Sequence, residues 1–193
     1  MSTHTNHTEY NETYFCTITC YKWLSIIQEA NAYEAVYNWF AHLIKDGCQL
    51  CGYVIMPNHL HVLLFPTHPE KPLSKLVGEG KRFIAYDIVK RLKSLGKTEL
   101  LNQLEEGVEA KEVANGKKHQ VFRLSFDARI CVDQKMIEQK LDYIHSNPVK
   151  GKWNLAGDYI SYPHSSARFY EEGVNERGLL THYKDVSIRV PFG

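Results

Sequence analysis

Two histidines, His59 and His61, stand two residues apart in a stretch of strand-forming residues. Residues spaced by two on a strand point to the same face, so both imidazoles would converge on one point while Leu60 and Val62 point into the core. Such a pair can hold a divalent ion and leave coordination positions open for a substrate oxygen and for water. The pair alone is a weak signal, because histidines also occur on half-buried strands without binding metal.

A tyrosine and an asparagine four residues apart, Tyr143 and Asn147, form a second candidate group. On a helix they would share a neighbouring face, and we expect Asn147 at the helix end because a residue before proline is pushed out of helical geometry. An amide oxygen is a reasonable third ligand beside two imidazoles, and the tyrosine hydroxyl one turn away could reach a phosphate held by the ion. Taken alone, this helix favours a plainer interpretation, with Asn147 as a cap and Tyr143 as an aromatic at the edge of the core.

Basic residues are concentrated between residues 71 and 97, although the whole chain carries a net charge of only +1. Within this segment eight Lys or Arg stand against two acidic residues, a local balance of +6. Nucleic-acid-binding domains usually show a clear basic excess, which the whole chain lacks. From charge alone, the segment favours a solvated helix face.

The length and composition of the chain bound its class. Its 193 residues, 44% hydrophobic and 23% charged, fit one ordinary globular domain, which we place at 13–170 between a polar tail at 1–12 and an accessory tail at 171–193. The first residues lack the apolar core of a signal peptide, and no later run approaches membrane length. We therefore expect a cytoplasmic protein with no membrane partner.

Five cysteines in a chain without a secretion signal are expected to be reduced thiols. Cys16 and Cys20, together with Cys48 and Cys51, have a spacing that a zinc site could use. The first pair falls in an expected strand, however, and no glycines typical of a ligand loop follow. The zinc interpretation is therefore the weaker one.

Hydrophobic periodicity and turn residues predict a mixed fold. The expected elements are a strand over 13–20, a helix through Ala32 and Leu43 that ends near Gly47, strands over 49–56 and 59–65, a helix over 81–95, a strand over 120–126, a helix from Asp133 and a short helix over 165–170. This order gives an α+β, ferredoxin-like fold, a split β-α-β-β-α-β antiparallel sheet with an added C-terminal helix that carries Tyr143. Residues 96–119 read as an inserted excursion outside the core.

Four segments in this order resemble the single-tyrosine HUH transposases with the IS200-like fold, and especially their REP-associated tyrosine transposase branch. The resemblance runs from about Thr13 to about Tyr170. It rests on Tyr53-Val-Ile-Met-Pro-Asn-His-Leu-His-Val-Leu-Leu64, Lys81-Arg82-Phe83, Tyr143-Ile-His-Ser-Asn-Pro-Val-Lys150 and Tyr162-Pro-His-Ser-Ser166.

The resemblance implies that His59, His61 and Asn147 bind Mg²⁺ or Mn²⁺ and that Tyr143 is the nucleophile of a transposase. Such an enzyme cuts single-stranded DNA next to a hairpin, forms a 5′-phosphotyrosine and rejoins strands. Related enzymes act as monomers or as homodimers. The residues that we expect to contact DNA phosphates are all basic: Lys81, Arg82, Lys117, Lys118, Lys150 and Lys152.

No residue stands out as a general base in the tyrosine helix. His145 lies about 200° around that helix from Tyr143, so we expect it to be a structural hydrogen-bond donor. Two features depart from the family pattern. The excursion at 96–119 is longer than usual, and Asp127-Ala128 stands where many relatives have an acidic residue with a histidine.

Three other functions compete with this interpretation. A histidine-triad nucleotide hydrolase would need a third alternating histidine, but position 63 is Leu63. A rolling-circle replication initiator would share the chemistry, although no helicase or second domain accompanies it here. A domesticated hairpin DNA-binding protein would keep the fold without cleaving, and the intact Tyr143 argues for activity without proving it.

Overall fold

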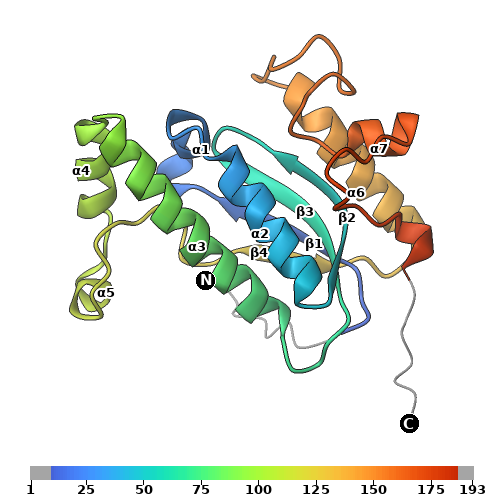
Figure 1. The fold of residues 1–193 in the computed structure, drawn as a ribbon, viewed down its shortest axis with the longest axis horizontal. Coiled ribbons are helices and arrows are strands. Elements are labelled where there is room, and N and C mark those ends of the chain that lie inside the picture. The colour runs from blue at the N-terminus through green and yellow to red at the C-terminus, as the bar shows by residue number, and fades with distance from the viewer. Residues whose placement is uncertain (1–9, 187–193) are drawn as a thin grey trace.

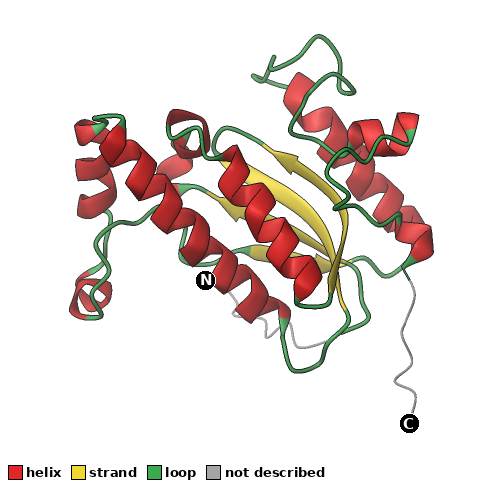
Figure 2. Ribbon diagram, viewed as in Figure 1, coloured by secondary structure: helices red, strands yellow, loops and turns green. Residues whose placement is uncertain are grey.

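The computed structural model describes residues 10–186 and contains one four-stranded antiparallel sheet among them (Figure 2). The strands are β1 (Tyr14–Thr19), β2 (Cys48–Ile55), β3 (His59–Pro66) and β4 (Asp127–Ile130), in the spatial order β2-β3-β1-β4. The chain crosses from β1 to β2, and β3 then pairs with both of them. This is the split arrangement that the sequence predicted, and the α+β fold class is confirmed.

Helices cover both faces of the sheet (Figure 1). Helices α2 (Tyr33–Lys45) and α3 (Leu73–Ser94) pack on one face, and α6 (Gln134–Ser146) packs on the other. The shorter helices are η1 (Tyr21–Trp23), α1 (Ile26–Glu29), α4 (Thr98–Glu106), α5 (Ala110–Ala114), η2 (Asn147–Val149), α7 (Ala167–Glu172) and η3 (Tyr183–Asp185). No helix within 10–186 is long and apolar enough to cross a membrane.

Helix α2 ends as its sequence predicts. Val36, Phe40 and Leu43 are buried at helical spacing. The chain then turns at Gly47, whose φ of +75° belongs to the left-handed region that favours glycine.

Helix α3 begins at Leu73 after Pro72, well before the predicted start at Lys81. The stripe of buried apolar residues continues towards the N-terminus of the predicted helix. A glycine in the first half of α3 lowers the helix propensity of this part of the sequence. That glycine, Gly80, is required by packing, because a Cβ atom there would lie 2.1 Å from Nε1 of Trp39. The predicted end near 95 is confirmed, but Leu95 itself is exposed.

The excursion at 96–119 is helical, as α4 and α5, but it is not wholly outside the core. Leu104 of α4 is fully buried in the main core cluster. The side of α4 that carries Leu104 is therefore anchored to the domain, whereas α5 contributes no buried residue.

The predicted strand over 120–126 is wrong, and β4 lies just after it at Asp127–Ile130. The segment 120–126 lacks the ladder of backbone pairs that a strand needs, although Val121 and Phe122 are both buried. It forms only an isolated bridge between Phe122 and Cys20 beyond the end of β1. The buried side chains of this segment therefore pack at the end of the core, and the segment does not extend the sheet.

The helix that carries Tyr143 begins as predicted, because the Asp133 side chain accepts a hydrogen bond from the backbone N–H of Met136 at 2.7 Å. The helix ends at Asn147 as predicted, but the backbone geometry there differs from the prediction. Asn147 keeps helical backbone angles, φ −56° and ψ −44°, despite the proline that follows. The chain continues directly into η2, so Pro148 does not force an extended residue here.

The expected tails lie partly outside the described residues, at 1–9 and 187–193. Within the rest, the segment from 171 to 186 returns to the sheet. Leu180 forms a bridge to Leu50 of β2, and Arg177 forms an ion pair with Glu34 of α2.

Candidate active site

The two histidines of β3 lie side by side under α6. His59 and His61 are 5% and 4% exposed, and their ring centroids are 4.7 Å apart. Leu60 and Val62 belong to the opposite core with α2 and α3. The prediction that Leu60 and Val62 face the core while the two histidines share the other face is therefore confirmed.

His61 is held by β1. The Nδ1 atom lies 2.9 Å from Oγ1 of Thr17, its cross-strand partner, while Nε2 is buried and has no hydrogen-bond partner. Burial is the main cause that lowers the pKa of His61 to about 3, and the charges of His59 and Lys140 are the lesser causes. The imidazole is therefore neutral near pH 7.

His59 is held by the residue before it. Its Nδ1 lies 2.6 Å from Oδ1 of Asn58, and the Nδ2 of Asn58 donates to the carbonyl of Trp23 at 3.0 Å. Because this orientation makes Oδ1 the acceptor, Nδ1 of His59 carries the hydrogen and Nε2 keeps its lone pair. Burial, followed by the nearby Lys152, lowers the pKa of His59 to about 4.

These histidines fit a divalent metal ion. Both are neutral, both are oriented through Nδ1 by a neighbouring side chain as metal-binding histidines usually are, and the Nε2 of His61 is a buried nitrogen without a hydrogen-bond partner. No group of three or more His, Cys, Asp or Glu within 10–186 could hold a metal on its own. A third ligand would thus come from an amide, from solvent or from substrate. Asn147 is half-buried one turn after Tyr143, and its role as that ligand stays a prediction.

The zinc interpretation of the cysteines finds no support in the structure. All five thiols are free and buried, and none belongs to a metal-binding group among the described residues. Burial raises the pKa of Cys20 and of Cys51 to about 12, so both remain protonated thiols at neutral pH.

Tyr143 lies against His61, with ring centroids 5.1 Å apart, and remains 49% exposed. Helix α6 reaches this position because Leu141 and Ile144 are buried against the sheet. A Cβ atom at Gly52 would lie 2.7 Å from Cδ2 of Leu141, so this glycine allows the close approach of the helix. The tyrosine is thus fixed beside the histidines and still accessible to a large substrate.

His145 points away from this group, as predicted. Its Nε2 lies 2.9 Å from the hydroxyl of Ser166, and that hydroxyl donates its own hydrogen to the carbonyl of Tyr53. His145 must then be the donor to Ser166, which confirms its structural role. Burial lowers the pKa of His145 to about 4.

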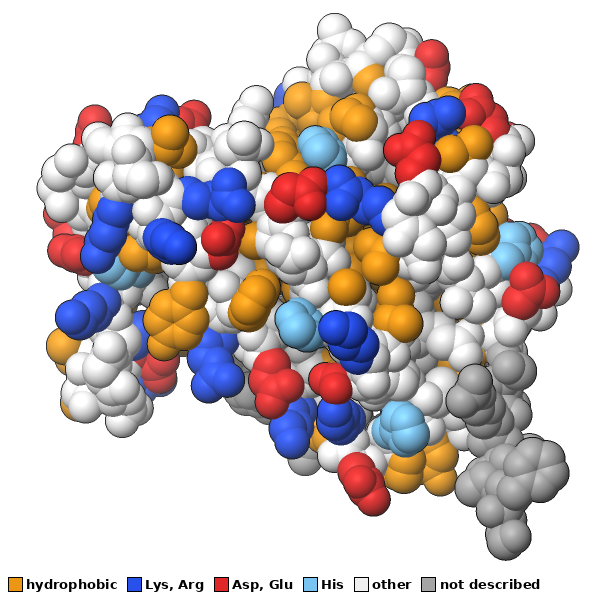
Figure 3. Space-filling model, in the orientation of Figure 1, with side chains coloured by type: hydrophobic (Ala, Val, Ile, Leu, Met, Phe, Trp, Pro, Cys, Tyr) orange, Lys and Arg blue, Asp and Glu red, His pale blue; other side chains and the backbone are white. Residues whose placement is uncertain are grey.

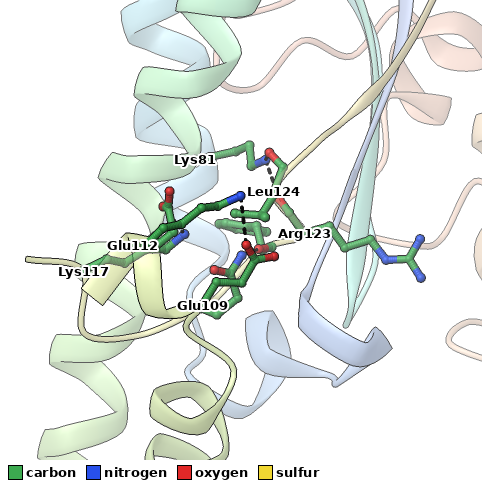
Figure 4. A network of polar contacts seen from close by, with 9 residues as sticks. Lys81, Glu109, Glu112, Lys117, Arg123 and Leu124 are labelled. Carbon is green, nitrogen blue, oxygen red and sulfur yellow. Dashed lines mark hydrogen bonds and ion pairs between the residues drawn. The ribbon is translucent and has the colours of Figure 1, made fainter. Parts of the chain in front are cut away.

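The basic residues that we expect to contact DNA divide into those bonded within the protein and those that are exposed. Lys81 donates to the carbonyls of Arg123, Leu124 and Ser125, at 2.6, 2.9 and 3.3 Å, and burial lowers its pKa to about 8 (Figure 4). Lys117 pairs with Glu112 at 3.3 Å. By contrast Arg82, Lys118, Lys150 and Lys152 are exposed, and the structure brings one of them, Lys152, into electrostatic range of His59.

The basic stretch from 71 to 97 is partly neutralised. Lys71, Arg91 and Lys97 form ion pairs with Asp46, Asp87 and Glu29. On this helix-covered face of the molecule, basic side chains lie among acidic ones instead of forming one continuous patch (Figure 3). The local excess of charge is therefore weaker in the folded protein than in the sequence.

A pair of side chains that the sequence did not single out flanks His59. The ring centroid of Trp23 is 5.5 Å from that of His59, and the guanidinium of Arg123 lies 5.2 Å from the Trp23 ring. Lys22 and Trp23 both have positive φ, +49° and +58°, a strained conformation that is found preferentially at functional sites. No sequence pattern marks this turn.

A cavity of about 230 Å³ opens on the other side, beside His61 and Tyr143. Its lining includes Arg129 and Lys140, neither of which sequence reasoning selected. Lys140 had a local signal, because it stands one helical turn before Tyr143. Arg129 had none, since its position depends on the pairing of β4 with β1.

Comparison with known proteins shows which known fold this chain shares. No family model matches the chain, and no curated protein is similar to it in sequence. A solved structure of the REP-associated tyrosine transposase bound to a REP hairpin aligns over 97% of this chain and 92% of its own, with a TM-score of 0.59 and 17% sequence identity. The protein therefore has the fold of that transposase.

Proposed function

We propose that this protein is a transposase, a metal-dependent endonuclease and strand transferase that acts on single-stranded DNA with Tyr143 as nucleophile. The observation that carries the proposal is the buried, unpartnered Nε2 of His61 directly beside the accessible Tyr143 ring. A buried imidazole nitrogen without a partner can bind a metal ion once it carries its lone pair, and an accessible tyrosine hydroxyl beside that ion can attack a phosphate that the ion holds.

The proposed metal ligands are His59, His61 and Asn147, and the ion is Mg²⁺ or Mn²⁺. When bound, such an ion supplies the positive charge that polarises a scissile phosphate. The protein keeps both imidazoles neutral by burial and orients them through Thr17 and Asn58. Neutral, fixed imidazoles offer their lone pairs without reorganisation.

Tyr143 carries the covalent step. Its hydroxyl gives up its proton to solvent and its oxygen forms a bond to phosphorus, the bond from phosphorus to the 3′-oxygen breaks, and that oxygen takes up a proton from solvent and leaves as a 3′-hydroxyl. The 5′-phosphotyrosine is a phosphodiester like the bond that was cut. A later 3′-hydroxyl can therefore attack it, release Tyr143 and join two strands without ATP.

The proposed substrate is a DNA end flanked by a hairpin. The structural neighbour was solved with a REP hairpin, and this chain shares its fold over nearly all of its length. Exposed cations that could follow the DNA backbone include Arg82, Lys118, Lys150 and Lys152. Lys152 is the strongest of these, because its charge already acts on His59.

The test is incubation of the protein with a labelled pool of single-stranded hairpin DNA and Mn²⁺, followed by a denaturing gel. We compare wild type with Tyr143→Phe and, as a matched control, with Tyr159→Phe, whose hydroxyl bonds to Glu171 at 3.1 Å. The proposal expects a protein-linked 5′ fragment from wild type and from the control, and none from Tyr143→Phe.

The opposite result is equally clear. If wild type binds hairpins from a broad pool but yields neither cleavage nor adduct with Mn²⁺ or Mg²⁺, the strand-transferase proposal fails. A hairpin DNA-binding protein without cleavage activity then becomes the better account.

A further inference from the structure

The cavity beside the site is lined by one face of three strands and by α6. Asp127 of β4, Thr17 of β1 and His61 of β3 form one row across the sheet, because Thr17 pairs with both of the others. The neighbouring row contains Arg129, paired with Phe15. The cavity therefore extends from His61 towards the β4 edge of the sheet.

Lys140 enters the same cavity from the helix. It stands three residues before Tyr143, and its Nζ lies 4.8 Å from the centroid of the Phe15 ring. The Phe15 ring stacks on His61 at 5.3 Å and meets Tyr143 edge-on at 6.0 Å. Phe15 is thus an apolar wall shared by the cation, the histidine and the tyrosine.

The charges in this cavity are not neutralised by ion pairs. Among the described residues, neither Arg129 nor Lys140 forms an ion pair, and the carboxylate of Asp127 is not within pairing distance of either. The three charges leave an excess of one positive charge. The volume of about 230 Å³ also far exceeds the roughly 15 Å³ that one water molecule needs.

We infer that this cavity is a subsite for a second phosphodiester group of the DNA strand, next to the phosphate that Tyr143 attacks and held by Lys140 and Arg129. Two cations converging from separate elements suit an anionic group with several oxygens, and guanidinium geometry matches phosphate well. Asp127 limits the site to one such group by opposing any further negative charge. The inference rests on the proposed function and adds to it how the strand is oriented across the site.

Binding and cleavage are measured separately to test the inference. The probe is a hairpin oligonucleotide that wild type retains from the pool, and its affinity is followed by fluorescence anisotropy without metal over a range of salt concentrations. We expect Lys140→Met to weaken binding on the order of tenfold and to lower the salt slope by about 0.7 for the lost single-strand contact. Lys140→Arg should restore most of the affinity, and Asp127→Asn should tighten binding.

Lys135→Met is the matched control, because Lys135 is an exposed residue of the same helix that does not line the cavity. It loses the same charge and should bind nearly as wild type. Thermal unfolding of each variant checks that α6 remains folded.

A second series locates the contact on the DNA. Single methylphosphonates remove the charge of one phosphate at a time along the probe. One position should weaken binding to wild type and have no further effect on Lys140→Met.

The outcomes distinguish this inference from the proposed function. The subsite is wrong, whatever the cleavage assay shows, if Lys140→Met binds the probe like Lys135→Met. It is also wrong if the loss of affinity caused by each methylphosphonate is as large in Lys140→Met as in wild type at every position. If the variant loses affinity as expected while wild type forms no adduct, the subsite stands and the strand-transferase proposal fails.

Discussion

The two faces of the sheet are made by the same strands but have different chemistry. On the face covered by α2 and α3, Leu60, Val62 and Leu64 are fully buried in a large apolar cluster. On the face covered by α6, the same strand presents His59 and His61 beside a cavity and an exposed tyrosine. Neighbouring residues of β3 thus alternate between holding the fold and forming the site.

Alternate residues of one strand therefore serve stability and the proposed function. A change on the α2 and α3 side should destabilise the protein and leave the chemistry of the folded fraction intact. A change on the α6 side should remove chemistry at a smaller cost in stability.

The largest effect is expected for His59→Ala combined with His61→Ala. Adduct formation with Mn²⁺ should fall by at least roughly a thousandfold, because the proposed ion loses both imidazoles. Denaturing gels measure the adduct and urea unfolding measures the stability. Near-normal cleavage by the double variant would remove the basis for the site, and complete unfolding would show that the two faces are not separable.

Leu60→Ala should lower the free energy of unfolding by about 2–5 kcal/mol, because the Leu60 side chain is fully buried. In sequence this residue lies between the two histidines. The folded fraction of the variant should still cleave. Urea unfolding at low temperature gives the value, with the half-exposed Leu124→Ala as a control that should change stability by less than about 0.5 kcal/mol. Equal losses in the two variants would contradict the assignment of the core.

Thr17→Val keeps the shape of the side chain and removes the hydroxyl that contacts Nδ1 of His61. The Mn²⁺ concentration needed for half-maximal cleavage should rise about 10–100-fold, as is typical when a group that orients a metal ligand is lost. Thr19→Val serves as the control on the same strand, because Thr19 pairs with His59 through the backbone. The orienting role of Thr17 is refuted if both variants need the same Mn²⁺ as wild type.

The smallest effect concerns a half-buried histidine outside the site. Burial, and after it Arg177, lowers the pKa of His164 to about 4, while its Nδ1 lies 3.1 Å from the hydroxyl of Tyr37. Its pKa in the unfolded chain is about 6.5, so the unfolded state takes up a proton first as the pH falls. The stability contributed by the neutral ring is fully present above pH 6.5 and is lost as the pH falls towards 4.

Because His164 is partly exposed, the loss should be on the order of 1 kcal/mol. Unfolding curves at pH 7 and pH 5 should show a smaller pH dependence in His164→Gln than in wild type. An unchanged pH dependence would mean that other groups account for the acid sensitivity.

The parts of the structure that the sequence predicted have strong local patterns. Strand β3 alternates clearly, and α6 has an N-cap at Asp133 and an apolar stripe. The predictions failed where packing overrides the pattern. Gly80 weakens the signal of α3 but is needed for contact with Trp39, and the segment with Val121 and Phe122 has strand-forming residues but forms only an isolated bridge.

The candidate site was predicted only in part for a similar reason. His59, His61 and Tyr143 stand in segments that resemble the single-tyrosine HUH transposases, and it was this resemblance that implied their roles as metal ligands and nucleophile. Thr17 and Arg129 reach the site through the pairing of β1 with β3 and β4, which no local pattern specifies. Residues brought in by strand register are therefore prominent among those that sequence reasoning missed.

The most direct test of the central claim is a Mn²⁺ titration followed by electron paramagnetic resonance, in the presence of bound hairpin DNA. The account predicts one bound Mn²⁺ per chain for wild type, weaker binding for Asn147→Ala and none at the same concentration for His59→Ala combined with His61→Ala. A variant that lacks both histidines and still binds Mn²⁺ as tightly as wild type would contradict the account.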